Sequence, residues 1–170
     1  KDTWKALQML ARHHRLSFDV PVIAVTGSNG KTIVKEWLYQ LLSPDWRITR
    51  SPRSYNSQVG VPLSLWEMDE MTQLAIIEAG ISQPGEMERL AEMILPTIGV
   101  FTGLGDAHQE NFDSLEQKGR EKMKLFAWCS KVVCPDGTDC AGLKGDVVRW
   151  AWGDATADFC VTAKDRVTSS

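Results

Sequence analysis

The chain has 170 residues, of which 43% are hydrophobic and 24% are charged, and its formal net charge is −3. This length suits one domain with a sizeable core, and the composition is that of an ordinary globular protein. The small negative charge gives no electrostatic reason to expect a nucleic-acid partner, and no apolar run approaches the ~20 residues that a membrane-spanning helix needs.

Alternating helical and strand patterns run along most of the chain. Apolar residues at helical spacing predict a helix over residues 4–15, and a continuous apolar run over residues 20–26 predicts a strand buried on both faces. Further strands are expected over residues 46–49, 74–77, 98–102, 131–134, 147–152 and 159–162, and further helices over residues 32–42, 85–94 and 114–128. This alternation predicts an α/β fold with a mainly parallel sheet flanked by helices on both faces.

Several residue types invite a functional role but have a simpler structural one. The cysteines match no common zinc or redox spacing, so we expect reduced, mostly buried thiols of a cytosolic domain; they are Cys129, Cys134, Cys140 and Cys160. His13 and His14 are expected at a solvated helix end. Helical spacing among apolar neighbours places three tryptophans in the core, namely Trp37, Trp66 and Trp128.

The strongest local signal is the segment TGSNGKT at residues 26–32, between the first strand and the next helix. Its glycines allow a tight turn whose N–H groups face phosphate oxygens, and the helix N-terminus adds partial positive charge. The cradle would consist of Gly27, Ser28, Asn29 and Gly30. Lys31 can reach the outer phosphates, and the Thr32 hydroxyl can bind magnesium. These features predict a P-loop-type ATP site.

The segment departs from the full pattern GxxxxGK(S/T), because Val25 stands where that pattern has its first glycine. A glycine-rich turn that is followed by Lys-Thr without binding phosphate is the structural alternative. The apolar strand before the turn and the helix after it favour the phosphate site.

Four segments in this order resemble the central domain of the Mur ligases, the ATP-dependent enzymes that add amino acids to the muramyl peptide precursor. They are residues 26–36 (TGSNGKTIVKE), 55–62 (YNSQVGVP), 76–80 (IIEAG) and 105–126, which contains His108 and Lys122. Within the family, these segments are most similar to the ligases that join D-alanyl-D-alanine (D-Ala-D-Ala) to UDP-N-acetylmuramoyl-tripeptide (UDP-MurNAc-tripeptide). The amino-acid sequence of residues 120–126 is similar to that of such ligases fused to an alanine racemase.

The resemblance implies a cytoplasmic enzyme that transfers the γ-phosphoryl group of ATP to a carboxylate, after which an amine attacks the acyl phosphate. In the family, residues matching Thr32 and Glu78 hold one Mg²⁺ ion. A histidine matching His108 serves a second Mg²⁺ ion, and the lysine matching Lys122 carries a carbamate that binds metal. The same resemblance gives Lys31, Asn56, His108 and Lys122 catalytic roles, and Asn56 with Ser57 would position the acyl phosphate.

Each of these residues also has a structural alternative. Glu78 could be an ion-pair partner at the end of a buried strand, and His108 could be an exposed loop residue. Lys122 shares its helix with other cations, so a solvated basic face or an alignment error of one turn could explain it; these neighbours are Lys118, Arg120 and Lys124. The order and spacing of the segments behind the phosphate loop favour the metal-binding roles.

The resemblance also bears on domain organisation. Residues 1–18 are expected to be a lead-in helix and linker from a missing N-terminal domain, and residues 19–170 an ATP-binding central domain that is cut before its end. The family's His-Asn-x-x-Asn stretch, which helps to hold the adenine, does not occur. We therefore expect no ligase turnover from the fragment alone.

Three other functions remain open at this point. Another ligase of the superfamily, such as a folylpolyglutamate synthase or a different Mur ligase, would differ in its substrates. A plain P-loop NTPase or kinase would release phosphate without an amine acceptor. A non-catalytic nucleotide-binding module would not depend on His108 or Lys122.

Overall fold

The structure is a computed structural model, which describes residues 3–105, 111–153 and 156–162. Its strands are β1 (Val22–Thr26), β2 (Ile48–Arg50), β3 (Leu74–Glu78), β4 (Ile98–Phe101), β5 (Lys131–Pro135), β6 (Asp146–Trp152) and β7 (Phe159–Val161). Its helices are α1 (Thr3–Arg15), α2 (Lys31–Leu42), α3 (Gly60–Trp66), α4 (Glu86–Ile94), α5 (Leu115–Met123) and the short 3₁₀ helix η2 (Lys124–Phe126).

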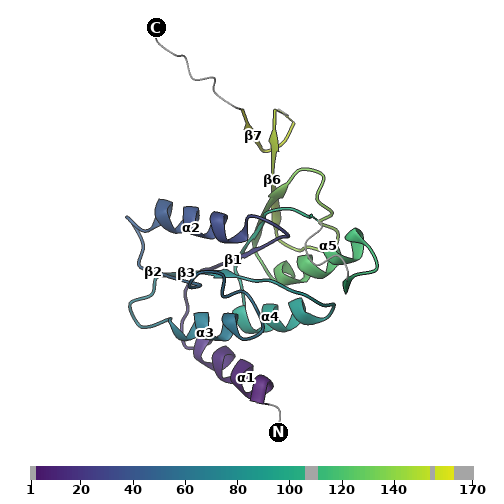
Figure 1. The fold of residues 1–170 in the computed structure, drawn as a ribbon. Coiled ribbons are helices and arrows are strands. Elements are labelled where there is room, and N and C mark those ends of the chain that lie inside the picture. The colour runs from purple at the N-terminus through teal and green to yellow at the C-terminus, as the bar shows by residue number, and fades with distance from the viewer. Residues whose placement is uncertain (1–2, 106–110, 154–155, 163–170) are drawn as a thin grey trace.

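The strands form one seven-stranded sheet in the order β2-β3-β1-β4-β5-β6-β7, and every neighbouring pair is parallel. Helix α2 covers one face of the sheet, and α3 and α4 cover the other (Figure 1). The predicted α/β class, with a parallel sheet between helices, is confirmed. None of the helices formed by the described residues is long and apolar enough to cross a membrane.

Strand β1 divides its side chains between two hydrophobic cores. Val22 and Ala24 belong to the larger core, which includes residues of α3 and α4. Ile23 and Val25 belong to a smaller core against α2. All five residues of β1 are buried, as expected for a central strand of a parallel sheet. Because both faces of β1 are covered by a hydrophobic core, its sequence is a continuous apolar run.

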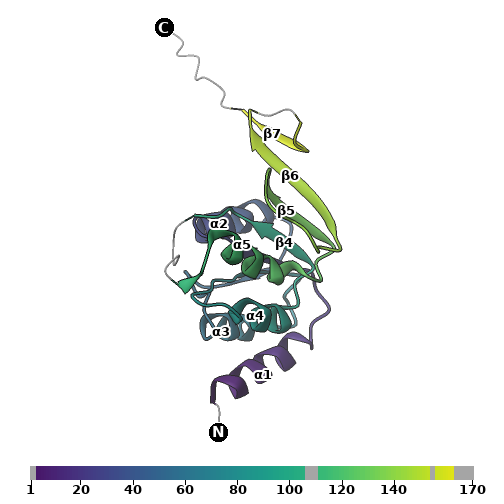
Figure 2. The ribbon, with the colours of Figure 1, turned by 90° about the vertical axis from the view of Figure 1, so that its right-hand side faces the viewer.

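Helix α1 packs outside α3 and α4 as an additional layer (Figure 2). Ala11 is fully buried in the larger core, and Arg15 donates hydrogen bonds to the main-chain oxygens of Ile94 (3.0 Å) and Leu95 (3.4 Å) at the end of α4. These contacts attach α1 firmly to the sheet domain. The domain boundary near residue 18 stays a prediction.

The far end of the sheet is less covered than its centre. Strands β6 and β7 extend away from the helical layers (Figure 2), and Trp152 and Phe159 are 68% and 62% exposed. The buried cores therefore lie around β1 and its neighbours, where the phosphate loop begins.

The tryptophan prediction was wrong, because Trp37, Trp66 and Trp128 are 62%, 45% and 58% exposed. Helix α2 carries two apolar stripes. Val34 and Leu38 pack on the sheet, and Trp37 lies on the stripe that faces outward. Helical spacing identifies a stripe but does not say which stripe is buried.

Two local expectations also need correction. His13 is exposed as expected, but His14 stacks on Trp66 with ring centroids 4.5 Å apart and hydrogen-bonds with the Met68 carbonyl at 2.9 Å. The helix expected over residues 114–128 ends earlier, because the chain tightens into η2 after Met123. This turn packs Phe126 against Gly99, where a Cβ atom would lie 2.4 Å from the ring.

Candidate nucleotide site

The phosphate loop follows β1 and turns sharply at two glycines. Gly27 has φ 148° and Gly30 has φ 79°, conformations that side chains disfavour. A Cβ atom on Gly27 would lie 2.0 Å from Thr102 Oγ1, so only glycine allows the loop to approach the end of β4 this closely. Thr102 Oγ1 also donates a 2.6 Å hydrogen bond to the carbonyl of Asn29. These contacts fix the loop from outside.

Polar groups inside the loop are arranged as a phosphate would require. The hydroxyl of Ser28 is buried and has no hydrogen-bond partner among the described residues. Lys31 Nζ lies at the loop and donates to the carbonyls of Gly27 (3.0 Å) and Ser28 (3.2 Å). Burial lowers the pKa of Lys31; Glu78 opposes this shift and Lys118 adds to it. An orphaned donor and a half-buried cation both fit an anionic ligand.

Thr32 and Glu78 meet at the first turn of α2. Glu78 ends β3 on the same face as Leu74 and Ile76, which is the face that packs on α2. Thr32 Oγ1 donates to both carboxylate oxygens, at 2.9 and 3.1 Å. A buried carboxylate and a hydroxyl beside a phosphate loop are hard oxygen donors that fit Mg²⁺. Among the described residues, no three His, Cys, Asp or Glu side chains gather as an alternative metal site.

Asn56 joins this pair from the loop before α3. Its side-chain Nδ2 atom donates a 2.7 Å hydrogen bond to Glu78 Oε1. Its main-chain carbonyl accepts a 2.7 Å hydrogen bond from the N–H group of Gly80. The neighbouring Ser57 hydroxyl accepts a hydrogen bond from the N–H group of Gly60 at 3.1 Å. Asn56 therefore contacts the Glu78 carboxylate, and Ser57 supports the start of α3. Their role in positioning an acyl phosphate stays a prediction.

Helix α5 brings Lys122 to the phosphate loop, where its Nζ atom donates to the Gly27 carbonyl at 3.2 Å. Burial, with added repulsion from Lys31 and Lys118, lowers the pKa of Lys122 from 10.5 to about 8. Lys118 and Lys122 are only 1% and 3% exposed, which contradicts a solvated basic face for these two residues. Lys118 hydrogen-bonds with the Gly105 carbonyl and not with the loop. Lys122 is therefore the better match to the expected site residue.

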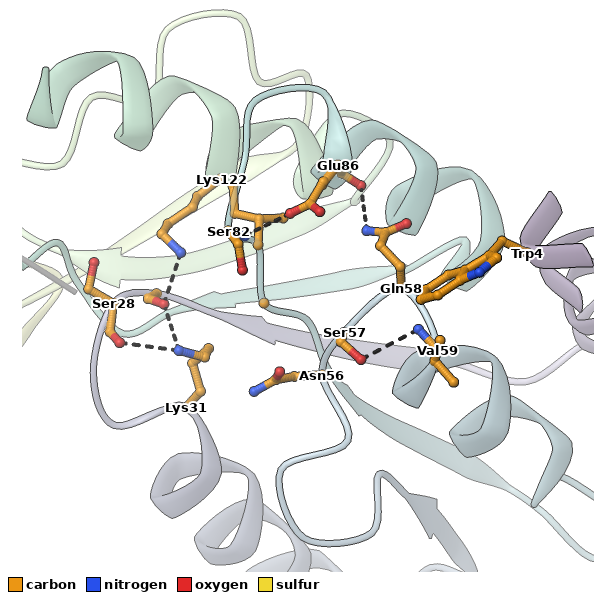
Figure 3. Close-up of a pocket in the computed structure, with 13 residues that line it drawn as sticks. Trp4, Ser28, Lys31, Asn56, Ser57, Gln58, Val59, Ser82, Glu86 and Lys122 are labelled. Carbon is orange, nitrogen blue, oxygen red and sulfur yellow. Dashed lines mark hydrogen bonds between the residues drawn. The ribbon is translucent and has the colours of Figure 1, made fainter. Parts of the chain in front are cut away.

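A cavity of about 290 Å³ opens between these elements, and Gly27, Lys31, Asn56 and Lys122 line it (Figure 3). Gln58 and Trp4, which comes from α1, line the side away from the lysines, and Glu86 lies beside Ser82 (Figure 3). A second cavity of about 320 Å³ surrounds the phosphate loop beside Thr32 and Glu78. Together the two cavities offer one space for phosphates and an adjoining space for a second reactant.

The sequence missed some residues of this site. Trp4 and Glu86 carry no motif, and only the packing of α1 and α4 reveals them. Lys118 was named from the sequence only as a cation on the same helix as Lys122, and its burial could not be predicted from that spacing. His108 lies in residues 106–110, outside the described residues.

Comparisons with known proteins point to one family. Residues 25–140 match the family model of the Mur ligase middle domain. A curated relative from Bacillus subtilis, a UDP-N-acetylmuramoyl-tripeptide–D-alanyl-D-alanine ligase, is 34% identical over 125 residues; the match covers 74% of this chain and 27% of that protein. The ligase of the same name from Borreliella burgdorferi is 36% identical over 122 residues, or 72% of this chain and 26% of the relative. The chain thus spans about a quarter of the length of these relatives.

Solved structures give the same result. The MurF crystal structure from Acinetobacter baumannii superposes with a TM-score of 0.83 at 27% identity, covering 89% of this chain and 36% of that one. MurF from Thermotoga maritima in complex with ADP superposes with a TM-score of 0.78 at 26% identity, covering 88% and 37%. On its sequence, its fold and the arrangement of its phosphate loop, this chain belongs to the Mur ligase middle-domain family.

Proposed function

We propose that this chain is the ATP-binding part of a ligase that joins D-Ala-D-Ala to UDP-MurNAc-tripeptide through an acyl phosphate. The observation that carries the proposal is the meeting of three elements at two adjoining cavities that share Lys31 and Asn56: the phosphate loop with Lys31, the Thr32–Glu78 pair, and Lys122 from α5. The names of the curated relatives support the choice of substrates. The ADP complex of the Thermotoga maritima structure supports the choice of nucleotide.

In this proposal the residues position reactants and neutralise charge, with no protein nucleophile. A carboxylate oxygen of the tripeptide attacks the γ-phosphorus of ATP, and ADP leaves. The amine of the dipeptide then attacks the acyl carbon, loses a proton, and phosphate leaves from the tetrahedral intermediate. Lys31 holds the β- and γ-phosphates, and Asn56, beside Lys31 in the cavity wall, holds the acyl phosphate.

Thr32 and Glu78 would hold one Mg²⁺ ion in this enzyme, and His108 and Lys122 would serve a second. Bound magnesium neutralises the negative charge that accumulates on the transferred phosphoryl group. Lys122 would act as a carbamate, which turns a cation into an anionic ligand. The lowered pKa of Lys122, about 8, supports this assignment, because only the neutral amine reacts with carbon dioxide.

Further domains belong to the proposal as well. Residues 1–18 would lead in from a domain that grips the UDP-sugar, and residues 19–170 would be followed by the rest of the central domain and by a domain that delivers the amine. The chain by itself would then bind ATP weakly and form no amide. These domains would enclose the cavity lined by Lys31 and Lys122.

The acyl phosphate gives a direct test in the complete protein. Incubation with Mg-ATP, UDP-MurNAc-tripeptide and hydroxylamine, without D-Ala-D-Ala, should yield the tripeptide hydroxamate, identified by mass. If no hydroxamate forms and the rate of ATP hydrolysis is the same with and without the tripeptide, the protein is instead a plain NTPase. Hydroxamate formed from a different acid would indicate another ligase of the superfamily.

A further inference from the structure

Lys35 is a completely buried cation one turn after Thr32 on α2. Its Nζ atom lies 3.6 Å from Glu78 Oε2 and 3.3 Å from Glu36 Oε1. The Glu78 side chain is 1% exposed, whereas that of Glu36 is 33% exposed. A buried charge is costly unless it is paired and hydrogen-bonded. Lys35 and Glu78 therefore compensate each other inside the protein.

The same ammonium group also holds the loop that leads to Asn56. Lys35 Nζ donates to the Ser51 carbonyl at 2.8 Å and to the Arg53 carbonyl. Arg53 has φ 48°, a left-handed conformation that is uncommon for residues other than glycine. Such strain persists where the surroundings stabilise it, and here the buried ammonium group bonds directly to the strained residue.

Ser51 completes the arrangement from the other end of Glu78. It is fully buried, and its hydroxyl accepts a 3.0 Å hydrogen bond from the N–H group of Glu78. Its own N–H group donates to the Ile76 carbonyl at 3.0 Å. The main chain of Glu78 is thus fixed by Ser51, and the carboxylate is flanked by Lys35.

We propose that Lys35 and Ser51 are positioning residues that form an outer layer of the magnesium site. They hold the Glu78 carboxylate toward Thr32, and they hold the loop that presents Asn56, before the nucleotide arrives. The inference rests on the proposed function, since it takes Glu78 as a magnesium ligand. Lys35 lies behind the Glu78 carboxylate as an ion-pair partner at 3.6 Å, and Ser51 holds the Glu78 main chain. Such outer partners of a metal ligand commonly contribute about 10- to 100-fold to metal affinity.

The test measures ATP binding to the complete protein by calorimetry, once with Mg²⁺ and once with EDTA. The ratio of the two dissociation constants is the magnesium enhancement. We expect Lys35→Met to lower the enhancement about tenfold or more and to leave binding in EDTA unchanged, because residues 27–31 still hold the phosphates. Ser51→Ala should lower the enhancement about fivefold, as suits one neutral hydrogen bond. Glu36→Gln is the matched control, since it removes the other carboxylate beside Lys35, and it should leave the enhancement unchanged.

An unchanged enhancement in folded Lys35→Met protein would overturn the proposal. If Lys35→Met weakens ATP binding equally with Mg²⁺ and with EDTA, the proposal is also overturned, because that result indicates a loosened phosphate loop. If Lys35→Met does not fold, as judged by circular dichroism, Ser51→Ala decides the question by the same criteria. If the unchanged protein shows no enhancement, Glu78 does not bind magnesium, and both the metal assignment and this inference are wrong.

Discussion

Thr32 Oγ1 lies 2.9 Å from Glu78 Oε2, although 46 positions separate the two residues in the sequence. The sheet topology brings them together, because β3 pairs directly with β1 and places Glu78 opposite Val25, just before the phosphate loop. Helix α2 then starts over this edge with Thr32 in its first turn. A parallel sheet collects the carboxyl ends of its strands in this way, and ligands bind there in many open α/β folds.

The hydrogen bond between Asn56 and Glu78 can be tested by comparing a neutral and a negatively charged substitution at Asn56. Asn56→Ala removes a donor to a buried carboxylate and should cost about 1–3 kcal/mol in the free energy of unfolding. Asn56→Asp should cost more, because it places a second carboxylate in the position of a group that is 2.7 Å from Glu78. Millimolar Mg²⁺ should narrow the difference between the two variants in urea unfolding. If the difference in unfolding free energy between the two variants is the same with and without Mg²⁺, a cation site at Glu78 is contradicted.

The two glycines of the phosphate loop should differ in their tolerance of a side chain. Gly30→Ala meets open space but keeps φ 79°, so it should cost about 1–2 kcal/mol. Gly27→Ala adds a clash with Thr102 Oγ1 and should cost at least about 1 kcal/mol more. Urea unfolding of the pair measures the difference. Equal stability of the two variants would show that the loop does not press against Thr102.

Lys122 predicts a particular pH dependence of stability. Since folding lowers its pKa from 10.5 to about 8, the unfolded chain binds more protons than the folded chain between these pH values. The contribution of Lys122 to stability should therefore rise as pH increases from about 8 to 10.5, after being fully unfavourable below that range. Burial is the main cause, and repulsion by Lys31 and Lys118 adds to it.

The variant Lys122→Met lacks this titration. In bicarbonate-free buffer, its stability advantage over the unchanged protein should shrink across the same pH range. Lys144→Met, at an exposed lysine, is the control and should follow the unchanged protein at every pH. Parallel curves for Lys122→Met and Lys144→Met would refute the lowered pKa.

The cysteines should differ in their reaction with a disulfide reagent. All four are free thiols; Cys160 is exposed and Cys140 is half-buried. Burial raises the pKa of Cys129 and of Cys134 to about 12, and the thiolate is the reactive form. We expect Cys160 to react first in the native protein, and Cys129 and Cys134 to react only after denaturant is added. Rapid reaction of all four thiols in the native state would contradict the buried positions.

Much of the fold could be predicted from local sequence patterns. Each predicted strand has its counterpart, because buried parallel strands such as β1 and β3 are continuous apolar runs. Periodicity cannot show orientation, however, and so Trp37 was expected in the core. Only the tertiary packing of Val34 and Leu38 on the sheet decides which stripe of α2 faces solvent.

The site residues that belong to one contiguous sequence motif could be predicted. Lys31 and Thr32 follow a glycine-rich turn, which predicts their phosphate and magnesium roles, whereas the magnesium role of Glu78 was predicted from the family resemblance. Lys35 could not be found in this way, because a lysine in a helix is usually exposed. Its burial depends on carbonyl groups of Ser51 and Arg53, whose positions are set by a loop without periodicity.

The central claim, an ATP-dependent ligase, is tested most directly by phosphate release from Mg-ATP in the complete protein. UDP-MurNAc-tripeptide and D-Ala-D-Ala are added separately and together, with Lys31→Ala as the inactive comparison. The account predicts sustained release only with both substrates, and its loss in Lys31→Ala because the β- and γ-phosphates lose their cation. Equal release with neither substrate present would contradict the ligase and leave an NTPase on the same fold.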